Sequence, residues 1–221
     1  MKFNSKKEQI YIYLRDQIMT GAIAPGERLV IDKLAEELNT SQTPLREVLR
    51  MLESDGLVDI EPYIGARVAP LEADSIYEIF SLLSSLEISS SKLACHRMSD
   101  EQLDELAGRV EAMAALTDKP DAWSQENKAL HAFICECATM PLMRRMLLTV
   151  LDHWDRLRRI YLNDVSSKRV ATAQQEHVDL LAALRARDPE RVEQILRKHN
   201  EASLNAYLTL LQESGALEKV L

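Results

Sequence analysis

The pattern of apolar positions divides the chain into two parts, which meet near Pro70. In the first part, apolar residues recur at helical spacing in three short stretches that are separated by turns. The first stretch ends at Gly21, the second covers residues 31–38, and the third begins at Ser41. Two short apolar runs around a turn follow, as in a β-hairpin. This pattern predicts three helices and a two-stranded hairpin within residues 1–70.

The third stretch predicts an amphipathic helix with one polar face. Ser41 stands where it is expected to cap the helix, and Pro44 is tolerated in the first turn. The inward face is apolar and consists of Leu45, Val48, Leu49 and Leu52. The outward face carries hydroxyl, amide and guanidinium groups on Ser41, Gln42, Thr43, Arg46 and Arg50. Groups of these kinds reach phosphates and base edges in a DNA major groove, and a helix N-terminus favours a phosphate.

Three helices followed by a hairpin form the outline of a winged helix-turn-helix. Gly65 and Arg67 lie at the hairpin, where a wing can approach the adjacent minor groove closely. The pattern alone leaves one alternative open, a small helical protein-interaction module whose arginines are ordinary solvated residues.

The second part, from Leu71 onward, contains few Gly or Pro residues and predicts six helices. They are expected near residues 72–97, 100–117, 120–138, 141–163, 167–187 and 189–215. The expected breaks between them include Ser166–Ser167 and Asp188–Pro189. Short connections between long helices favour an antiparallel bundle. We therefore expect a mainly α protein, with a winged helix-turn-helix over residues 1–70 and an antiparallel all-α bundle over residues 71–221.

Composition and cysteine usage limit the compartment. The 46% hydrophobic and 28% charged residues are typical of an ordinary globular protein. No apolar run reaches the length of about 18 residues that a membrane span needs, and the N-terminus lacks the apolar core of a signal peptide. Cys135 and Cys137 leave a zinc site open, but together with Cys95 they are better explained as buried free thiols. We therefore expect a cytoplasmic protein with no membrane partner.

The net charge of −8 argues at first against nucleic acid as a partner. Residues 1–70 hold 9 Lys and Arg against 11 Asp and Glu, so most of the acidic excess lies in the second part. Because phosphate binding needs a local basic face rather than a basic protein, DNA stays a candidate partner.

Three of the five histidines lie on the apolar faces of three different predicted helices: His131, His177 and His199. Asn127 precedes His131 by one helical turn. A single inward histidine is usually a hydrogen-bonded core residue, but three in one bundle suit Zn²⁺ or Ni²⁺, with open positions for an anion. The residues alone leave both interpretations open. His153 lies on the edge of its apolar face, and His96 is expected on the surface.

The segment from Ile18 to Pro70 closely resembles the GntR family of bacterial regulators. The matching segments are GAIAPGERL at 21–29, LAE at 34–36, SQTPLREVL at 41–49, DGLV at 55–58 and GARV at 65–68. The resemblance implies DNA contact by Arg28, Ser41, Thr43, Pro44, Arg46 and Gly65. The family commonly has Arg where this chain has Gln42. Since glutamine pairs with adenine and arginine with guanine, we expect an operator that differs at that position, or weaker binding.

Residues 71–215 resemble the FCD ligand-binding domain that follows the GntR module in the FadR subfamily. That domain carries the pattern (Asp/Asn)-x-x-x-His, a second histidine two helices later and a third on the last helix. The resemblance implies metal ligation by Asn127, His131, His177 and His199. The implied metal is zinc, with nickel or manganese as alternatives, and the neutral Asn127 lowers the expected affinity. Six helices, with no extra helix before Leu71, resemble the VanR-type branch rather than the acyl-CoA-binding arrangement.

A departure from the family pattern concerns the effector. Family members often carry an arginine four residues before the glutamate of an R-x-x-L-E motif, where it helps to hold a carboxylate. Here Leu86 and Glu87 are present, but Leu83 occupies the arginine position. Either the effector is not the usual small carboxylate, or another cation replaces that arginine. Candidates are Arg156, Arg158 and Arg159, for which a solvated basic face is the simpler interpretation.

Together these features predict a homodimeric, metabolite-responsive repressor that binds an inverted-repeat operator in double-stranded DNA. Its helical domain is expected to bind a divalent metal and a small anionic effector, whose binding residues the sequence does not identify. One alternative is a metal-dependent hydrolase, but no carboxylate is expected beside the histidines as a general base, so we do not expect an enzyme. The other is a DNA-binding dimer whose metal is purely structural.

Overall fold

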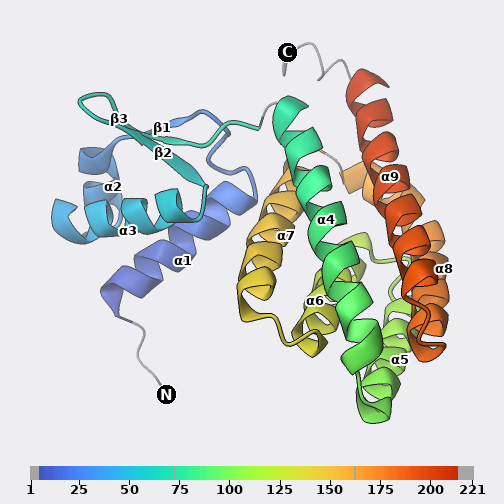
Figure 1. Ribbon diagram of the computed structural model, residues 1–221. Coiled ribbons are helices and arrows are strands. Elements are labelled where there is room, and N and C mark those ends of the chain that lie inside the picture. The colour runs from blue at the N-terminus through green and yellow to red at the C-terminus, as the bar shows by residue number, and fades with distance from the viewer. Residues whose placement is uncertain (1–4, 72, 162, 214–221) are drawn as a thin grey trace. The chain divides into compact units, whose positions relative to one another are not determined.

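The computed structural model describes residues 5–71, 73–161 and 163–213 of the chain. The chain forms two compact units, Met1–Glu72 and Ala73–Leu221. Figure 1 shows a small unit with a sheet and a larger unit made of helices. Each unit has its own buried apolar core, so each is described separately.

Over residues 5–71, the first unit contains three helices and a small antiparallel sheet. The helices are α1 (Lys6–Met19), α2 (Ile31–Glu37) and α3 (Gln42–Ser54), and the strands are β1 (Arg28–Leu29), β2 (Val58–Glu61) and β3 (Gly65–Val68). The strand order is β1-β3-β2, so the predicted hairpin of β2 and β3 is confirmed. The sequence pattern missed β1, because two residues are too short to show the alternation of a strand.

Helix α3 packs its predicted apolar face into the core of this unit, against α1. Ser41 is the N-cap residue, but the prediction that its side chain caps the helix is wrong, since it makes no capping hydrogen bond. A capping hydroxyl accepts from the N–H of the second or third helical residue. The third helical residue here is Pro44, which has no N–H. The Ser41 hydroxyl is therefore exposed at the start of α3.

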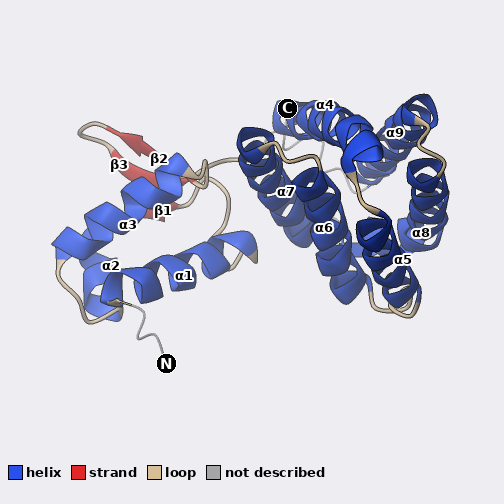
Figure 2. Cartoon of the chain, turned by 60° about the horizontal axis from the view of Figure 1, so that its bottom comes forward, coloured by secondary structure: helices blue, strands red, loops and turns tan. Residues whose placement is uncertain are grey.

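Over residues 73–161 and 163–213, the second unit is a bundle of six helices, as predicted (Figure 2). They are α4 (Ala73–Arg97), α5 (Asp100–Ala114), α6 (Pro120–Cys137), α7 (Pro141–Tyr161), α8 (Asn163–Arg185) and α9 (Pro189–Glu213). Helix α4 packs against α6, α7 and α9, and α8 packs against α5, α6 and α9. The predicted break at Ser166–Ser167 is wrong, since α8 begins at Asn163 and continues through both residues. Serine is only moderately unfavourable in a helix, and no Gly or Pro reinforces the signal there.

Buried polar residues interrupt the apolar core of this bundle. Glu87 lies on α4, while Asn127 and His131 lie on α6. His177 on α8 and His199 on α9 are buried as well. Because buried polar groups are costly without partners, their concentration in one core marks the place where a site is to be sought.

The predicted buried free thiols are confirmed, because Cys95, Cys135 and Cys137 are all buried and free. Cys135 and Cys137 belong to two different apolar clusters, which separates their side chains and opposes a shared zinc site. Burial raises the pKa of Cys137 to about 11, so this thiol is protonated at neutral pH. Among the described residues, no helix is long and apolar enough to cross a membrane.

Candidate metal centre and nucleic-acid interface

Three histidine rings converge inside the bundle from three helices. His131, His177 and His199 each offer a ring nitrogen, and these atoms lie within 4.8 Å of one another. Their ring centroids are 5.2 to 5.8 Å apart. Both intervals between these histidines along the chain exceed twenty residues, so the packing of α6, α8 and α9 creates the cluster. Imidazoles arranged in this way can hold a divalent ion.

Unsatisfied polar atoms support a metal-binding role for this cluster. Neither ring nitrogen of His177 has a hydrogen-bond partner among the described residues, and the Oδ1 atom of Asn127 has none either. Leaving such buried groups unsatisfied costs about 1–3 kcal/mol each. Burial lowers the pKa of His177 well below its usual value, and the neighbouring His199 and His131 lower it further. The neutral imidazole that results is the form that binds a metal.

Two carboxylates orient the other two rings. An oxygen of Glu87 lies 3.2 Å from Nδ1 of His131, and an oxygen of Glu176 lies 2.7 Å from Nδ1 of His199. A carboxylate on Nδ1 fixes the tautomer in which Nε2 carries the lone pair for a metal. The sequence predicted no carboxylate beside the histidines as a general base, whereas the structure places two beside the rings, each at an Nδ1 atom. Glu87 and Glu176 come from other helices than their partners, which sequence spacing does not reveal.

Further hydrogen bonds hold both carboxylates in place. The Nδ2 group of Asn200 donates to Glu87 over 2.8 Å. Arg169 donates from Nη1 and Nη2 to the two oxygens of Glu176, over 3.1 and 2.5 Å. Burial raises the pKa of Glu176, but hydrogen bonds from His199 and Arg169 outweigh it and lower that pKa to about 2. Glu176 is therefore charged at neutral pH.

A cavity of about 40 Å³ adjoins the histidine cluster. Its polar lining includes Asn127, Arg169, His199 and Ser203, and its aromatic lining is Trp123, Trp154 and Tyr207. The ring of Trp123 also stacks on His177, with 5.5 Å between centroids. One wall of the cavity is thus continuous with the candidate metal ligands.

The three arginines considered as effector ligands have other surroundings. Arg156 and Arg158 are buried, so the interpretation of a solvated basic face is wrong for both. Arg158 donates to Asp155 and Asp121, and Arg159 donates to Asp155. The arginine that lines the cavity is Arg169, which the sequence reasoning did not single out. Leu83 is buried in an apolar cluster with Phe80 and Tyr207.

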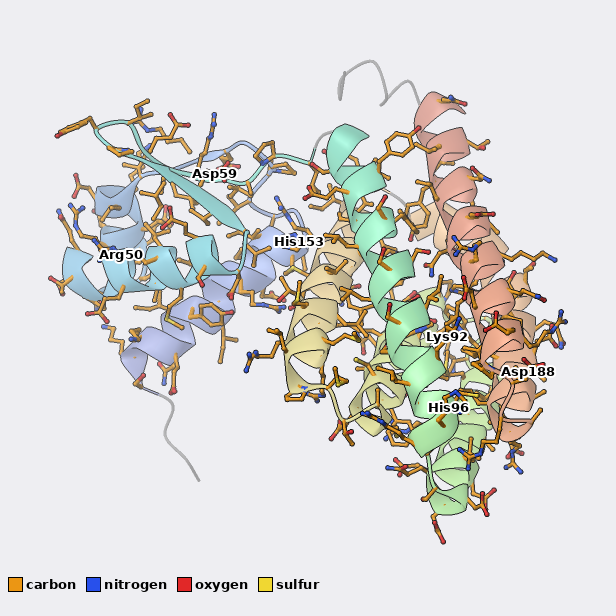
Figure 3. All side chains as sticks on the ribbon, viewed as in Figure 1. Arg50, Asp59, Lys92, His96, His153 and Asp188 are labelled. Atoms are coloured by element: carbon orange, nitrogen blue, oxygen red, sulfur yellow. The ribbon has the colours of Figure 1, made fainter. Side chains whose placement is uncertain are left out.

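The remaining two histidines lie outside the cluster (Figure 3). His96 is exposed near the C-terminal end of α4, which confirms the prediction that it lies on the surface. His153 is half-buried on α7.

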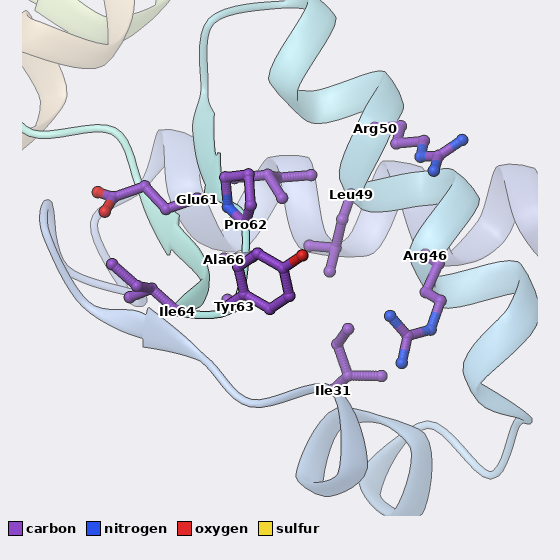
Figure 4. Close-up of a pocket in the computed structure, with 11 residues that line it drawn as sticks. Ile31, Arg46, Leu49, Arg50, Glu61, Pro62, Tyr63, Ile64 and Ala66 are labelled. Carbon is purple, nitrogen blue, oxygen red and sulfur yellow. The ribbon is translucent and has the colours of Figure 1, made fainter.

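In the first unit, a groove of about 450 Å³ lies between α3 and the β2–β3 hairpin. Figure 4 shows Arg46 and Arg50 on α3 and Tyr63 and Ile64 in the hairpin turn. Gly65 lines the groove as well, at a φ of +117°. The structure thus brings three of the predicted DNA-contacting residues, Arg46, Arg50 and Gly65, to one groove.

The other predicted DNA-contacting residues surround this groove. Ser41, Gln42 and Thr43 are exposed at the start of α3, and Pro44 is half-buried there. Gln42 donates to Asp32 over 2.5 Å and accepts from Arg46 over 3.3 Å.

Two arginines of the sheet have partners of their own. Arg28 donates from Nη2 to the carbonyl oxygen of Ile64 over 2.6 Å, which ties β1 to the hairpin turn. Arg67 pairs with Glu61 at 2.8 Å and lies 3.8 Å from Asp59. Arg67 therefore brings less unneutralised positive charge to this surface than Arg46 or Arg50.

A winged helix-turn-helix joined to an all-helical domain with a buried histidine cluster defines a class of DNA-binding transcription regulators. Residues 6–68 match the model of the bacterial regulatory proteins of the gntR family, and residues 78–202 match the FCD domain. The chain therefore belongs to the GntR family and carries an FCD domain, as its sequence motifs indicated. It is a transcriptional regulator and not an enzyme.

Two relatives that are named transcriptional repressors agree with the assignment to this family. The chain is 29% identical over 198 residues to the HTH-type transcriptional repressor GlaR of Escherichia coli, covering 86% of this chain and 90% of GlaR. It is 23% identical over 210 residues to the transcriptional repressor RspR of the same organism, covering 94% and 91%. Among solved structures, E. coli McbR/YncC matches with a TM-score of 0.74 at 24% identity, covering 96% of this chain and 100% of that one.

Proposed function

We propose that this regulator is a metabolite-responsive repressor whose FCD domain binds a divalent metal and a small anionic effector. The observation that carries the proposal is the convergence of His131, His177 and His199, in which both ring nitrogens of His177 lack a partner within the described chain. Nitrogen ligands with one amide oxygen from Asn127 suit zinc first, with nickel or manganese as alternatives. Repression is the favoured polarity because GlaR and RspR are named repressors. A repressor acts where the bacterial chromosome lies, in the cytoplasm.

The DNA-binding surface in this proposal consists of the start of α3 and the adjacent wing. Its residues are Arg28, Ser41, Gln42, Thr43, Pro44, Arg46, Arg50, Gly65 and Arg67. The side chains at the start of α3 would read base edges in the major groove, while the wing approaches the minor groove. An inverted-repeat operator requires two such surfaces, and therefore a homodimer.

Exposed apolar residues on α4 and α7 support dimer formation. Tyr77 and Leu82 on α4 are exposed, as are Leu142 and Met146 on the neighbouring α7. Large exposed apolar side chains are more frequent at protein interfaces than on the rest of a protein surface. Effector binding in the FCD domain would change the relative placement of the two DNA-binding units and shift operator affinity by about 1–3 kcal/mol.

The test is elemental analysis of protein purified without an affinity tag. Wild type is expected to hold about one divalent ion per chain, a stoichiometry set by the one histidine cluster within the described part of the chain. The double variant His177→Ala/His199→Ala is expected to hold none, while His96→Ala, which changes an exposed histidine, retains the metal. Absence of metal from wild type after incubation with zinc, nickel or manganese would refute the metal proposal. Titration of operator affinity with metal and with small acids then separates a sensory metal from a structural one.

A further inference from the structure

The turn at the tip of the wing holds a tyrosine in a strained backbone conformation. The turn covers residues 61–64, and the N–H of Ile64 donates to the carbonyl oxygen of Glu61 over 3.2 Å. Pro62 is its second residue, and Tyr63 is its third, at a φ of +66°. A positive φ after proline is the pattern of a type II turn, in which this position favours Gly or Asn. Because the strain at Tyr63 lowers stability, its side chain is expected to have a function outside the fold.

The apolar side chains at this tip do not stabilise the first unit by burial. Tyr63 is fully exposed, and Ile64 is 60% exposed. The apolar core of the unit includes Ala66 but neither of these two residues. The backbone of the turn is nevertheless held in place, because Arg28 donates to the carbonyl oxygen of Ile64 over 2.6 Å. The wing thus presents two apolar side chains to solvent from an anchored turn.

The charges of the wing are unfavourable for electrostatic binding to a minor groove. Residues 58–68 contain one positive side chain, Arg67, and two negative ones, Asp59 and Glu61. Arg67 pairs with Glu61 at 2.8 Å and lies 3.8 Å from Asp59. Proteins that enter a narrow minor groove by electrostatic attraction insert Arg or Lys, and residues 62–66 contain neither. Other minor-groove proteins insert apolar side chains between base pairs and bend the DNA.

The position of the tip identifies DNA as its binding partner. Tyr63 and Ile64 line the same groove as Arg46 and Arg50 of α3 (Figure 4). The apolar tip is therefore continuous with the proposed DNA-binding surface. When a recognition helix lies in the major groove, an adjacent wing reaches the neighbouring minor groove.

We propose that Tyr63 and Ile64 enter the minor groove as an apolar wedge, which partly separates two stacked base pairs and bends the operator. The inference rests on the proposed function of α3 and the wing as the DNA-binding surface. It adds the side chains that make the minor-groove contact and the feature of the DNA that they recognise. A wedge favours pyrimidine–purine steps, TA above all, because these steps are easily kinked and unstacked.

The fluorescent base 2-aminopurine reports this unstacking. Each adenine of an operator selected in vitro is replaced by 2-aminopurine in turn, and full-length protein is added. Wild type is expected to raise the emission at one step of each half-site, because a base that leaves the stack is no longer quenched. Replacement of a TA step at that place by AA is expected to weaken wild-type binding by about tenfold.

A double variant removes the wedge without adding strain. Tyr63→Asn/Ile64→Thr replaces both apolar side chains, and asparagine tolerates a positive φ, so the midpoint of urea unfolding should be no lower than for wild type. Affinity for the operator with TA is expected to fall about 10- to 100-fold. The emission change and the preference for TA should disappear, while the salt dependence stays the same because no charge is removed. Tyr13→Asn, which changes an exposed tyrosine of α1, should behave as wild type.

The outcomes distinguish this inference from the proposed function. Wild-type affinity in the double variant, or no emission change in the wild-type complex, overturns the wedge and leaves DNA recognition by α3 intact. Arg46→Ala tests that recognition separately, since loss of a phosphate contact weakens the salt dependence by about one unit of its slope. A double variant that keeps its operator affinity but changes oligomeric state in sedimentation would assign the tip to a protein interface and overturn the inference. Failure of wild type to select any operator refutes both proposals.

Discussion

An oxygen of Glu176 lies 2.7 Å from Nδ1 of His199, although the residue next to Glu176 in sequence, His177, has no partner for either ring nitrogen among the described residues. Consecutive residues of a helix point about 100° apart, so Glu176 faces α9 while His177 faces the shared centre. Arg169, two turns earlier on α8, holds Glu176 from the other side. The geometry gives Glu176 one task, to orient His199.

Substitution of Glu176 tests this task. Glu176→Gln keeps the size of the side chain but removes the charge that favours the Nδ1–H tautomer of His199 and makes the ring more basic. Metal affinity is expected to fall about 10- to 100-fold, as for other residues that orient a metal ligand. Competition with a chromophoric chelator measures it. Asp179→Asn, an exposed change one turn further along α8, is the control, and equal affinities for both variants would contradict the orienting role.

A substitution of Asn127 is expected to raise metal affinity, whereas Glu176→Gln lowers it. Asn127→Asp places a negative charge where the family pattern allows either residue, and metal affinity should rise by roughly tenfold or more through Coulomb attraction. Asn205→Asp adds an equal charge at an exposed position of α9 and should leave metal affinity unchanged. An Asn127→Asp protein that binds metal no more tightly than wild type would exclude Asn127 as a ligand.

Features that belong to one continuous segment of the chain could be predicted from the sequence, and features with a weak local signal could not. Apolar periodicity predicted the inward face of α3 and the six helices of the FCD domain, because each is a property of one continuous segment. It failed at Ser166–Ser167 and at β1, where the local signal is ambiguous or too short.

The candidate site shows the same division. The histidines were predictable because each lies on an apolar face and together they fit a family pattern. Glu87, Arg169 and Glu176 were not, because their partners lie on other helices. Which side chains meet between helices depends on the rotation of each helix about its axis, and one sequence does not contain that information directly.

The substitutions Gly65→Ala and Gly108→Ala together test whether operator binding needs the backbone conformation of the wing. Its φ of +117° is one that residues with a side chain rarely adopt, and a Cβ atom would meet only the guanidinium of Arg28, at 3.7–3.8 Å. Gly65→Ala is therefore expected to lower stability by about 1–3 kcal/mol through backbone strain and to weaken operator binding. Gly108→Ala, at an open position inside α5, should instead raise stability by up to about 1 kcal/mol and leave DNA binding unchanged.

Urea unfolding followed by circular dichroism measures the stability of both variants, and fluorescence anisotropy measures their binding to an operator selected in vitro. If Gly65→Ala weakens binding no more than Gly108→Ala does, the wing conformation is not needed for operator recognition.

Gln42 tests whether the start of α3 reads bases or only contacts phosphates. Its amide donates to Asp32 and accepts from Arg46, so the side chain is positioned at the exposed edge of the predicted recognition surface. An arginine there pairs bidentately with guanine, whereas glutamine pairs with adenine. Gln42→Arg is therefore expected to change the preferred base at one operator position from adenine to guanine, with a discrimination of about 1–3 kcal/mol. Anisotropy titrations against operators that carry each base in turn measure this preference.

Asp32, which accepts a hydrogen bond from Gln42, allows a second test of base recognition at residue 42. Asp32 would compete with guanine for the new guanidinium, so Gln42→Arg/Asp32→Asn should discriminate more strongly than Gln42→Arg alone. Gln125→Arg adds the same charge on the exposed surface of α6 and should leave base preference unchanged. A phosphate contact has a different signature, since it strengthens binding to all operators about equally and steepens the dependence on salt. A uniform gain of that kind for Gln42→Arg would place residue 42 against the DNA backbone rather than against a base.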